Sequence, residues 1–348
     1  MMQRKLKVYQ LATNPVCAPY RMIYPGNALN RLGDVEVKLL AILGQGEFDE
    51  VVREADLFII QRMAMVENLG RIIDALNRKG IIVVYEIDDD LLNLDPASRF
   101  ASLVPKDFAR PIESCIRACQ CVQCSTRLLA ASLATVHPEV AVLENQLDHV
   151  PPFQDKATRD GTIVVGYAAG EHHGHDWAEV RSAYNRTIAE LKSAGVQVET
   201  WIVGDRDIFA SVDSPRKRFF PTMPRSDYLQ FLAQIDVSII PLRDSVFNRA
   251  KSDIKYLESA SMGTPVVASH TAYGGTIKNE ESGLLFRDAE EFAGQLKRLV
   301  IDRSLAGDLA RSAHRYVLQN RMIDQHVSKW AAAYQGWYAR RSELLKRT

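Results

Sequence analysis

The sequence predicts an α/β protein in which two doubly wound parallel sheets form two domains. Its 348 residues are enough for about two domains of roughly 150 residues each. Short apolar runs alternate with helical stretches along the whole chain, a pattern typical of βαβ units. Several runs, such as IIVVY and VSIIP, are apolar throughout. Such strands suit a parallel sheet that helices cover on both faces.

The apolar runs and the helical periods give the order of the expected elements. In the first half we expect strands at Leu6–Leu11, Asp56–Gln61, Ile81–Glu86 and Val122–Ser125. In the second half we expect them at Ile163–Tyr167, Val196–Val203, Val237–Pro241 and Pro265–Ser269. Helical periods lie between them, at Val66–Arg78, Trp177–Ala194, Ser226–Gln234 and Ser252–Ser261.

The chain is expected to divide at Asn145–Gly161, where two adjacent prolines and little periodicity are typical of a linker. We expect an N-terminal domain over residues 1–150 and a C-terminal domain over residues 151–320. Residues 321–348 are predicted to form a helix that packs back toward the N-terminal domain.

Composition excludes several classes of protein. The 43 acidic and 43 basic residues balance, which argues against a general nucleic-acid binder. No run approaches the about 20 apolar residues that span a bilayer, and the basic start of the chain is followed by a segment too short and polar for a signal peptide. We therefore expect a cytoplasmic protein. Its five cysteines do not predict a disulfide framework in so large a chain.

The segment FNRAKSDIKYLESASMGTPVVAS carries the most functional information. A helix is expected to begin at Ser252 as N-cap and to end near Met262, before a glycine and a proline. Lys251 and Lys255 flank its start, where the helix dipole disfavours cations. Free backbone N–H groups and two lysines together predict a site for an anion such as a diphosphate.

Glu258 extends this site along the helix. At about 100° per residue, Lys251, Lys255 and Glu258 fall on one stripe, and the apolar positions fall on another. A carboxylate one turn beyond the phosphates is placed to accept hydrogen bonds from sugar hydroxyls. The alternative is a solvated helix on which Lys255 and Glu258 pair with each other.

The same segment resembles the donor-binding helix of the family 4 glycosyltransferases. These enzymes have the GT-B fold, in which two Rossmann-like domains face a central cleft. An AKSxxKxLE stretch before a GxPVVAS strand is most similar to their bacterial polysaccharide-biosynthesis branch. Many members carry two glutamates eight residues apart. The second matches Glu258, whereas the first falls on Ala250, a departure that leaves the transferred sugar and full activity open.

A second stretch, VGYAAGEHHGHDW, resembles the glycine-rich loop after the first strand of the family's C-terminal domain. The resemblance implies that the backbone near Gly170 lies beside a phosphate. His173 precedes Asp176 by three residues, as in the family, and is expected to donate a hydrogen bond to phosphate or sugar. Asp176 can alternatively cap a helix that begins at Trp177.

The stretch FFPTMPRSDYLQFLAQIDVSIIPL is similar to the family's strand, loop and helix around the nucleotide base. Phe220 and Met223 are expected near the base, and the alternative is that the two phenylalanines, Phe219 and Phe220, belong to the core.

In the first half, YEIDDDLLNL places Asp88, Asp89 and Asp90 just after an apolar strand. Ligands of doubly wound sheets bind at the carboxyl ends of strands, so one of these acids can orient or deprotonate an acceptor hydroxyl. Helix capping or metal binding is the alternative. Similar enzymes carry an EIDDDL-like segment and an early arginine that matches Arg21, which is expected to reach across the cleft toward phosphate.

Two other clusters invite a metal. His172, His173 and His175 lack a clear further zinc ligand. The spacing of Cys115, Cys119, Cys121 and Cys124 fits no established metal site, and the family resemblance places these cysteines on a helix that runs into a buried strand, where cysteine packs as a small apolar residue. We expect no metal and no cofactor.

The resemblance implies a retaining, metal-independent transfer of a sugar from a nucleotide-diphosphate donor to a saccharide or glycolipid acceptor. The basic end YARRSELLKRT is either a solvated helix end or a weak contact with anionic lipid at the inner face of the cytoplasmic membrane. Ala250 keeps open a non-catalytic nucleotide-sugar-binding subunit. An NAD-type oxidoreductase is the remaining alternative, although the sequence lacks GxGxxG.

Overall fold

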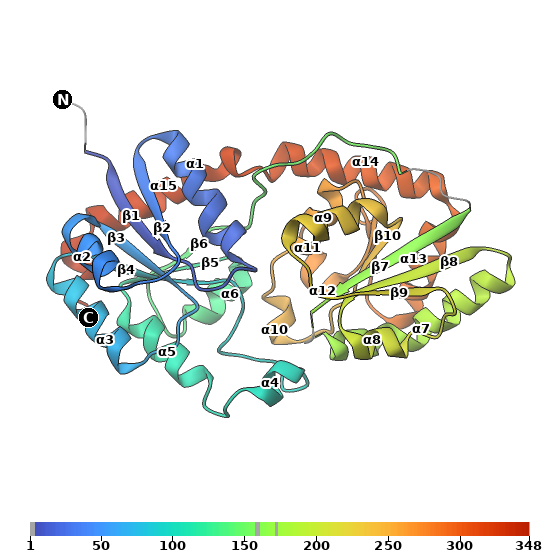
Figure 1. The fold of residues 1–348 in the computed structure, drawn as a ribbon, viewed down its shortest axis with the longest axis horizontal. Helices are drawn as coiled ribbons and strands as arrows, with labels where there is room; N and C mark the ends of the chain where they lie inside the picture. The colour runs from blue at the N-terminus through green and yellow to red at the C-terminus, as the bar shows by residue number, and fades with distance from the viewer. Residues whose placement is uncertain (1–3, 157–160, 171–172, 348) are drawn as a thin grey trace.

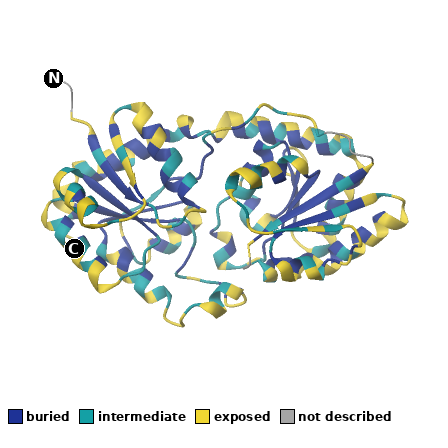
Figure 2. Ribbon diagram, viewed as in Figure 1, coloured by how far each residue is buried: buried dark blue, intermediate teal, exposed yellow. Residues whose placement is uncertain are grey.

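The computed structural model describes residues 4–156, 161–170 and 173–347. Two α/β domains lie side by side, each built around a six-stranded parallel sheet with helices on its faces (Figure 1). The fold class predicted from the sequence is confirmed. The central strands of both sheets are buried along most of their length, and exposed residues gather on the outer helices (Figure 2).

The N-terminal sheet has the strand order β2-β1-β3-β4-β5-β6. Its strands are β1 (Leu6–Leu11), β2 (Val35–Leu40), β3 (Leu57–Gln61), β4 (Ile82–Ile87), β5 (Cys121–Cys124) and β6 (Val140–Val142). The intervening helices are the π-helix η1 (Pro19–Ile23), α1 (Tyr24–Leu32), α2 (Gln45–Glu54), α3 (Glu67–Arg78), α4 (Arg99–Leu103), α5 (Ala109–Ala118) and α6 (Arg127–Leu133).

The C-terminal sheet has the order β12-β11-β10-β7-β8-β9. Its strands are β7 (Thr162–Ala169), β8 (Gln197–Gly204), β9 (Lys217–Phe220), β10 (Val237–Ile240), β11 (Val266–Ser269) and β12 (Leu284–Phe286). Its helices are α7 (Gly174–Ser193), α8 (Arg206–Ser211), α9 (Arg225–Gln234), α10 (Val246–Arg249), α11 (Ile254–Ser261), α12 (His270–Tyr273) and α13 (Ala289–Ile301).

The last long helices connect the two domains. Helix α14 (Arg303–Asn320) covers the C-terminal domain, and α15 (Ile323–Ala339) returns to the N-terminal domain, followed by α16 (Arg341–Leu344) (Figure 1). Trp330 and Tyr334 of α15 are buried in the same apolar cluster as strands of the first sheet. The Tyr334 hydroxyl donates a 3.1 Å hydrogen bond to Gln123 of β5.

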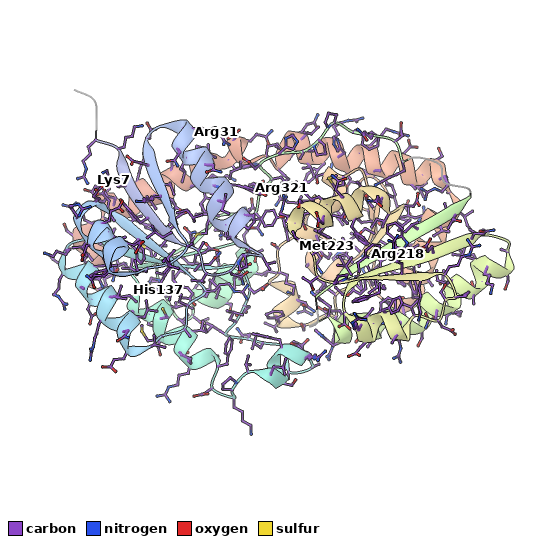
Figure 3. The ribbon with its side chains drawn as sticks, in the orientation of Figure 1. Lys7, Arg31, His137, Arg218, Met223 and Arg321 are labelled. Carbon is purple, nitrogen blue, oxygen red and sulfur yellow. The ribbon has the colours of Figure 1, made fainter. Side chains whose placement is uncertain are left out.

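The two segments that cross between the domains are joined to each other. Leu147 and Met322 form a parallel β-bridge, with Leu147 N donating to Arg321 O at 2.9 Å and Ile323 N donating to Leu147 O at 2.9 Å. The Arg321 side chain, near the middle of the molecule in Figure 3, donates to Asn145 O at 2.8 Å and binds the Asp253 carboxylate. The crossings therefore form one paired connection.

The structure differs from the sequence prediction at several elements. Helix α11 begins at Ile254 rather than Ser252, because the Ser252 hydroxyl accepts a 2.8 Å hydrogen bond from Asn145 instead of capping the helix. Helix α7 begins at Gly174, so Asp176 lies inside its first turn and the predicted cap at that residue is wrong. Strands β2, β6, β9 and β12 were not expected.

The expectation that the cysteines are buried, on a helix that runs into a strand, is confirmed. Helix α5 runs into β5, and all five cysteines are buried and free. Among the residues that the structure describes, no helix is long and apolar enough to cross a membrane.

Candidate active site

The two domains meet where strands of both sheets end, and charged side chains gather there. Asp89 follows β4 of the N-terminal domain, and its carboxylate lies 3.5 Å from the Lys251 ammonium of the C-terminal domain. Ala168 is the second-last residue of β7, and its carbonyl accepts a 3.1 Å hydrogen bond from the Lys255 ammonium. The predicted acceptor-side and donor-side residues are therefore neighbours in space.

Lys255 lies in the first turn of α11, with its ammonium 3.5 Å from His173 Nε2. Burial, and next the Lys251 ammonium, lower the pKa of Lys255 to about 8. Two cations thus share a poorly hydrated place beside the amino end of a helix, which itself disfavours positive charge. An anion bound between them would relieve this repulsion. The alternative, in which Lys255 pairs with Glu258 on a solvated helix, does not describe this site, because Lys255 is half-buried and the buried Glu258 contacts Tyr20 instead.

His173 is held by Asp176, whose side chain is fully buried. His173 Nδ1 lies 2.7 Å from Asp176 Oδ2. The other carboxylate oxygen accepts hydrogen bonds from Arg243 N at 2.9 Å and from the Asn248 side chain at 2.8 Å. Asp176 thus orients the imidazole, a role that second-shell carboxylates have for histidines elsewhere.

The protonation of His173 follows from these contacts. Burial, and next the Lys255 ammonium, lower its pKa to about 3, so the ring is neutral. The Asp176 carboxylate can only accept, which assigns the proton to Nδ1. Nε2 is then an acceptor, directed at Lys255. The expectation that His173 donates to a ligand is therefore wrong for this state: its free nitrogen accepts from an ammonium or a hydroxyl.

The acids after β4 divide into different roles. Asp88 and Asp89 lie 3.2 and 3.5 Å from the guanidinium of Arg62. Burial raises the pKa of Asp88, whereas Lys251 and Arg62 outweigh burial at Asp89 and lower its pKa. Asp90 is turned away and accepts from the Asn93 side chain. Asp89 is thus the ionised acid that meets the other domain.

Arg62 was not singled out in the sequence. It has a φ of 51°, although it is not glycine, and backbones of this kind are often held at functional sites. A charged residue directly after a buried strand, as at the end of LFIIQ, is the sequence signal that points to it.

Glu258 is buried, and its main partner comes from the N-terminal domain. The Tyr20 hydroxyl donates a hydrogen bond to Glu258 Oε1. The same hydroxyl accepts a 2.7 Å hydrogen bond from Arg225 Nε of α9. Neither Tyr20 nor Arg225 was predicted, because they are distant from Glu258 in sequence.

Ala250, at the place of the missing glutamate, is buried against the N-terminal core. Its carbonyl accepts a 2.8 Å hydrogen bond from Thr126 at the start of α6. A larger side chain here would have to displace this contact between the domains.

The remaining predicted donor residues lie as follows. Gly170 is exposed after β7, and a Cβ there would meet nothing within 4 Å. Phe220 and Met223 are partly buried against the small cluster around Trp201 and Phe231 (Figure 3 shows Met223), and for Phe220 this packing agrees with the core alternative.

Arg21 requires a correction. It is fully buried in the N-terminal domain, where its guanidinium donates to both oxygens of Glu86 at 2.7 and 3.1 Å and to Asn145 Oδ1 at 3.0 Å. It also lies 5.3 Å from the Trp330 ring centroid. A guanidinium committed in this way does not extend across the cleft toward a phosphate, so the expected role of Arg21 is wrong in this structure.

No group of three or more His, Cys, Asp or Glu residues is placed to hold a metal ion within the described part of the chain. His175 Nε2 lies 3.4 Å from Asp176 and 3.9 Å from Asp95. His172 lies outside the described residues.

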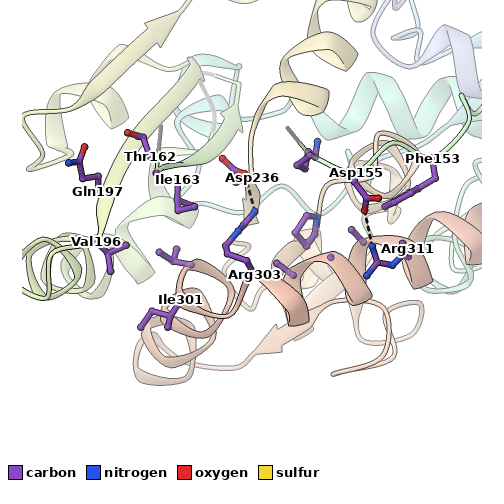
Figure 4. Close-up of a pocket in the computed structure, with 18 of the residues that line it drawn as sticks. Phe153, Asp155, Thr162, Ile163, Val196, Gln197, Asp236, Ile301, Arg303 and Arg311 are labelled. Atoms are coloured by element: carbon purple, nitrogen blue, oxygen red, sulfur yellow. Dashed lines mark hydrogen bonds and ion pairs between the residues drawn. The ribbon is translucent and has the colours of Figure 1, made fainter. Parts of the chain in front are cut away.

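A hollow of about 600 Å³ lies elsewhere, where β7 and β8 begin (Figure 4). Ion pairs of Arg303 with Asp236 (2.9 Å) and of Arg311 with Asp155 (2.8 Å) lie along it. It contains none of the predicted site residues, and ligands of such sheets bind at the opposite ends of the strands.

Comparisons with known proteins concern the family and the fold of the chain. Residues 164–302 match the family described as "Glycosyl transferases group 1". No curated protein matches the chain. The chain is similar in fold to sucrose-phosphate synthase from Thermosynechococcus elongatus (TM-score 0.66, 14% identity, 96% of this chain and 100% of that one).

Two further structures contain ligands. HepE from Anabaena, in complex with UDP and glucose, gives a TM-score of 0.64 at 14% identity over 94% of this chain and 100% of that one. A mutant of TarM from S. aureus, in complex with fondaparinux, α-GlcNAc-glycerol and UDP, gives 0.60 at 12% identity over 80% of this chain. This chain covers 55% of TarM. Residues 164–302 therefore match a glycosyltransferase domain, and the solved structures show that the chain has the GT-B fold.

Proposed function

We propose that this glycosyltransferase moves a sugar from a nucleoside-diphosphate donor to a hydroxyl acceptor, with retention of configuration and without a metal. One observation carries the proposal: Lys251 and Lys255 bring two ammonium groups to the amino end of α11, and the pKa of Lys255 is lowered to about 8. Such a site is costly when empty and favours a diphosphate. Fixed cations and helix amides supply the positive charge that a divalent metal would otherwise provide to a departing diphosphate.

The other residues have places around that anion. His173 Nε2 accepts a hydrogen bond from a hydroxyl of the transferred sugar, next to Lys255. Glu258, one turn farther along α11, accepts from donor hydroxyls, as acids do in other nucleotide sites. Asp89, which is ionised and lies beside Lys251, orients the acceptor hydroxyl. Retention is supported by the family resemblance of the donor helix.

The acceptor is a saccharide or a glycolipid in polysaccharide or glycoconjugate biosynthesis. HepE was captured with UDP and glucose and TarM with a glycosylated glycerol, so uridine diphosphate sugars are the first donors to try.

The test begins with thermal shifts of the purified protein against UDP, GDP, ADP, TDP and NAD. A ligand at about ten times its dissociation constant adds roughly 1.4 kcal/mol to stability. The proposal expects a shift with one nucleoside diphosphate, followed by transfer from its sugar conjugate in the presence of a chelator. Proton NMR of the product then reports the anomeric configuration. A shift with NAD alone, or activity restored only by a divalent cation, would contradict it.

Ala250 favours one second candidate, a subunit that binds the nucleotide sugar without transferring it. Alanine at this position supplies no carboxylate where the family has its first glutamate. Ala250 is instead buried against the N-terminal domain. Tight donor binding with neither transfer nor donor hydrolysis, across a panel of saccharide acceptors, would support this second candidate.

A further inference from the structure

Tyr20 lies on an irregular element that separates two neighbouring side chains. The π-helix η1 carries Tyr20 and Arg21 on consecutive positions, and π-turns are frequent at functional sites. Arg21 points into its own domain and is fixed there by Glu86 and Asn145. Tyr20 reaches the other domain and contacts Glu258. The buried arginine therefore anchors the turn from which Tyr20 extends.

The hydrogen bonds at the Tyr20 hydroxyl have a defined direction. Arg225 Nε donates to the hydroxyl oxygen at 2.7 Å, so the phenolic proton is free to point at Glu258 Oε1. The Arg225 guanidinium lies over the rings of Tyr20 and Tyr24, at 5.2 and 5.4 Å from their centroids. Arg225 itself stays 3.9 Å from Glu258. Tyr20 is thus the direct partner of the carboxylate, and Arg225 orients Tyr20.

We propose that Tyr20 is a positioning residue for Glu258, so that the N-terminal domain completes the donor site of the C-terminal domain. The inference rests on the proposed function, because it assigns to Glu258 the binding of donor hydroxyls. Tyr20 occupies Oε1 and fixes the plane of the carboxylate, and Oε2 is left for the donor. The donor is then bound with full affinity only when the two domains are in contact through Tyr20 and Glu258.

A charged state of Glu258 is part of this role. Burial raises the pKa of Glu258, whereas the hydrogen bond from Tyr20, then Arg225 and Lys255, oppose the rise. Removing the phenol hydroxyl removes the leading opposing contact. The acid form then persists to higher pH, and binding that needs the carboxylate is lost as pH falls through the raised pKa. The titratable groups around Glu258 are Tyr20, Tyr24, Arg225, Tyr228, Lys255 and Tyr273.

The experiment measures UDP binding to the full-length protein by calorimetry between pH 5.5 and 8.5, with GDP, ADP and TDP in parallel. Tyr20→Phe should weaken nucleotide affinity about tenfold at pH 7, as expected for a hydrogen bond to a charged group. The loss should grow toward pH 5.5. Tyr24→Phe is the matched control, since its ring stacks on the same guanidinium. It should bind within about twofold of the wild type.

A double variant separates positioning from packing. If Tyr20 acts through Glu258, adding Tyr20→Phe to Glu258→Gln should cause no further loss of nucleotide affinity. The loss of affinity toward low pH should be absent from Glu258→Gln and from the double variant. Wild-type binding by Tyr20→Phe at every pH, or additive losses in the double variant, would overturn the proposal. A folded wild-type protein that binds none of the four nucleotides would instead overturn the donor site, and with it this inference. Thermal melts of each variant verify folding.

Discussion

Replacing Lys255 by methionine should make the protein more stable while removing donor binding. The magnitude follows from the lowered pKa. The value falls from 10.5 to about 8, and a difference of about 2.5 at 1.36 kcal/mol each is about 3 kcal/mol of unfavourable interaction for the cation. Methionine has a similar length and no charge. It forfeits the hydrogen bond to Ala168 O, worth about 1 kcal/mol. A net gain of about 2 kcal/mol remains.

The sign of the effect depends on pH. Below pH 8 the lysine is protonated in both the folded and the unfolded chain, so the folded state bears the full cost. Between pH 8 and 10.5 the folded state releases its proton first, and the cost disappears. The gain of Lys255→Met should therefore be complete at pH 7 and clearly smaller at pH 9.5.

Urea unfolding and thermal melts at pH 7 and 9.5 measure this difference. Lys251→Met is the matched control, because it also relieves the repulsion between the two ammonium groups but breaks the pair of Lys251 with Asp89, so it should stabilise the protein less than Lys255→Met does. Nucleoside-diphosphate binding should be lost by more than tenfold in Lys255→Met. The reasoning would be refuted if Lys255→Met were no more stable than the wild type at pH 7, or if its gain were the same at both pH values.

Three further predictions follow from the same site. Donor affinity of the wild type should decline above about pH 8, as Lys255 loses its proton, and Lys255→Arg should move that decline to higher pH in a titration of binding. Asp176→Asn should lower kcat/KM by about 10- to 100-fold, because the amide no longer fixes the imidazole proton; unchanged turnover would remove His173 from the mechanism. Arg21→Met should destabilise the protein by about 3–5 kcal/mol through the unpaired Glu86, and the folded fraction should lose no more donor affinity than Tyr20→Phe does, because Arg21 acts only through the turn that carries Tyr20; a larger loss of affinity would restore Arg21 to the donor site.

The strands that could be predicted are those with a continuous apolar run. The runs in β3, β4 and β10 are buried on both faces and stand out in any sequence. Strands β2 and β9 could not be recognised in this way, because VEVKLL and KRFF lie at sheet edges and carry charges. Their existence depends on tertiary neighbours rather than on local composition.

Candidate site residues could be predicted where they lie close together in the sequence, and they could not be predicted where they are brought together only by the fold. Lys251, Lys255 and Glu258 belong to one short segment whose spacing indicates an anion site. Tyr20 lies 238 residues from Glu258, so only the folded chain brings them together. Arg21 was misjudged because its partner Glu86 is also remote, 65 residues along the chain. Glu86 within IVVYEI and Gln123 within CVQC were the available signal, since polar residues in buried strands require partners.

The paired crossing at Leu147 and Met322 has a mechanical consequence. The two segments that cross between the domains are hydrogen-bonded side by side. Such a pair resists twisting and sliding of one domain against the other, and it allows rotation about a single axis. Arg321 binds Asp253 and Asn145 donates to Ser252, so the start of α11, where we propose that the diphosphate binds, lies beside this paired connection. Points near a pivot travel least. Rotation of the domains about this connection would therefore move the start of α11 less than the parts of the domains that lie far from it.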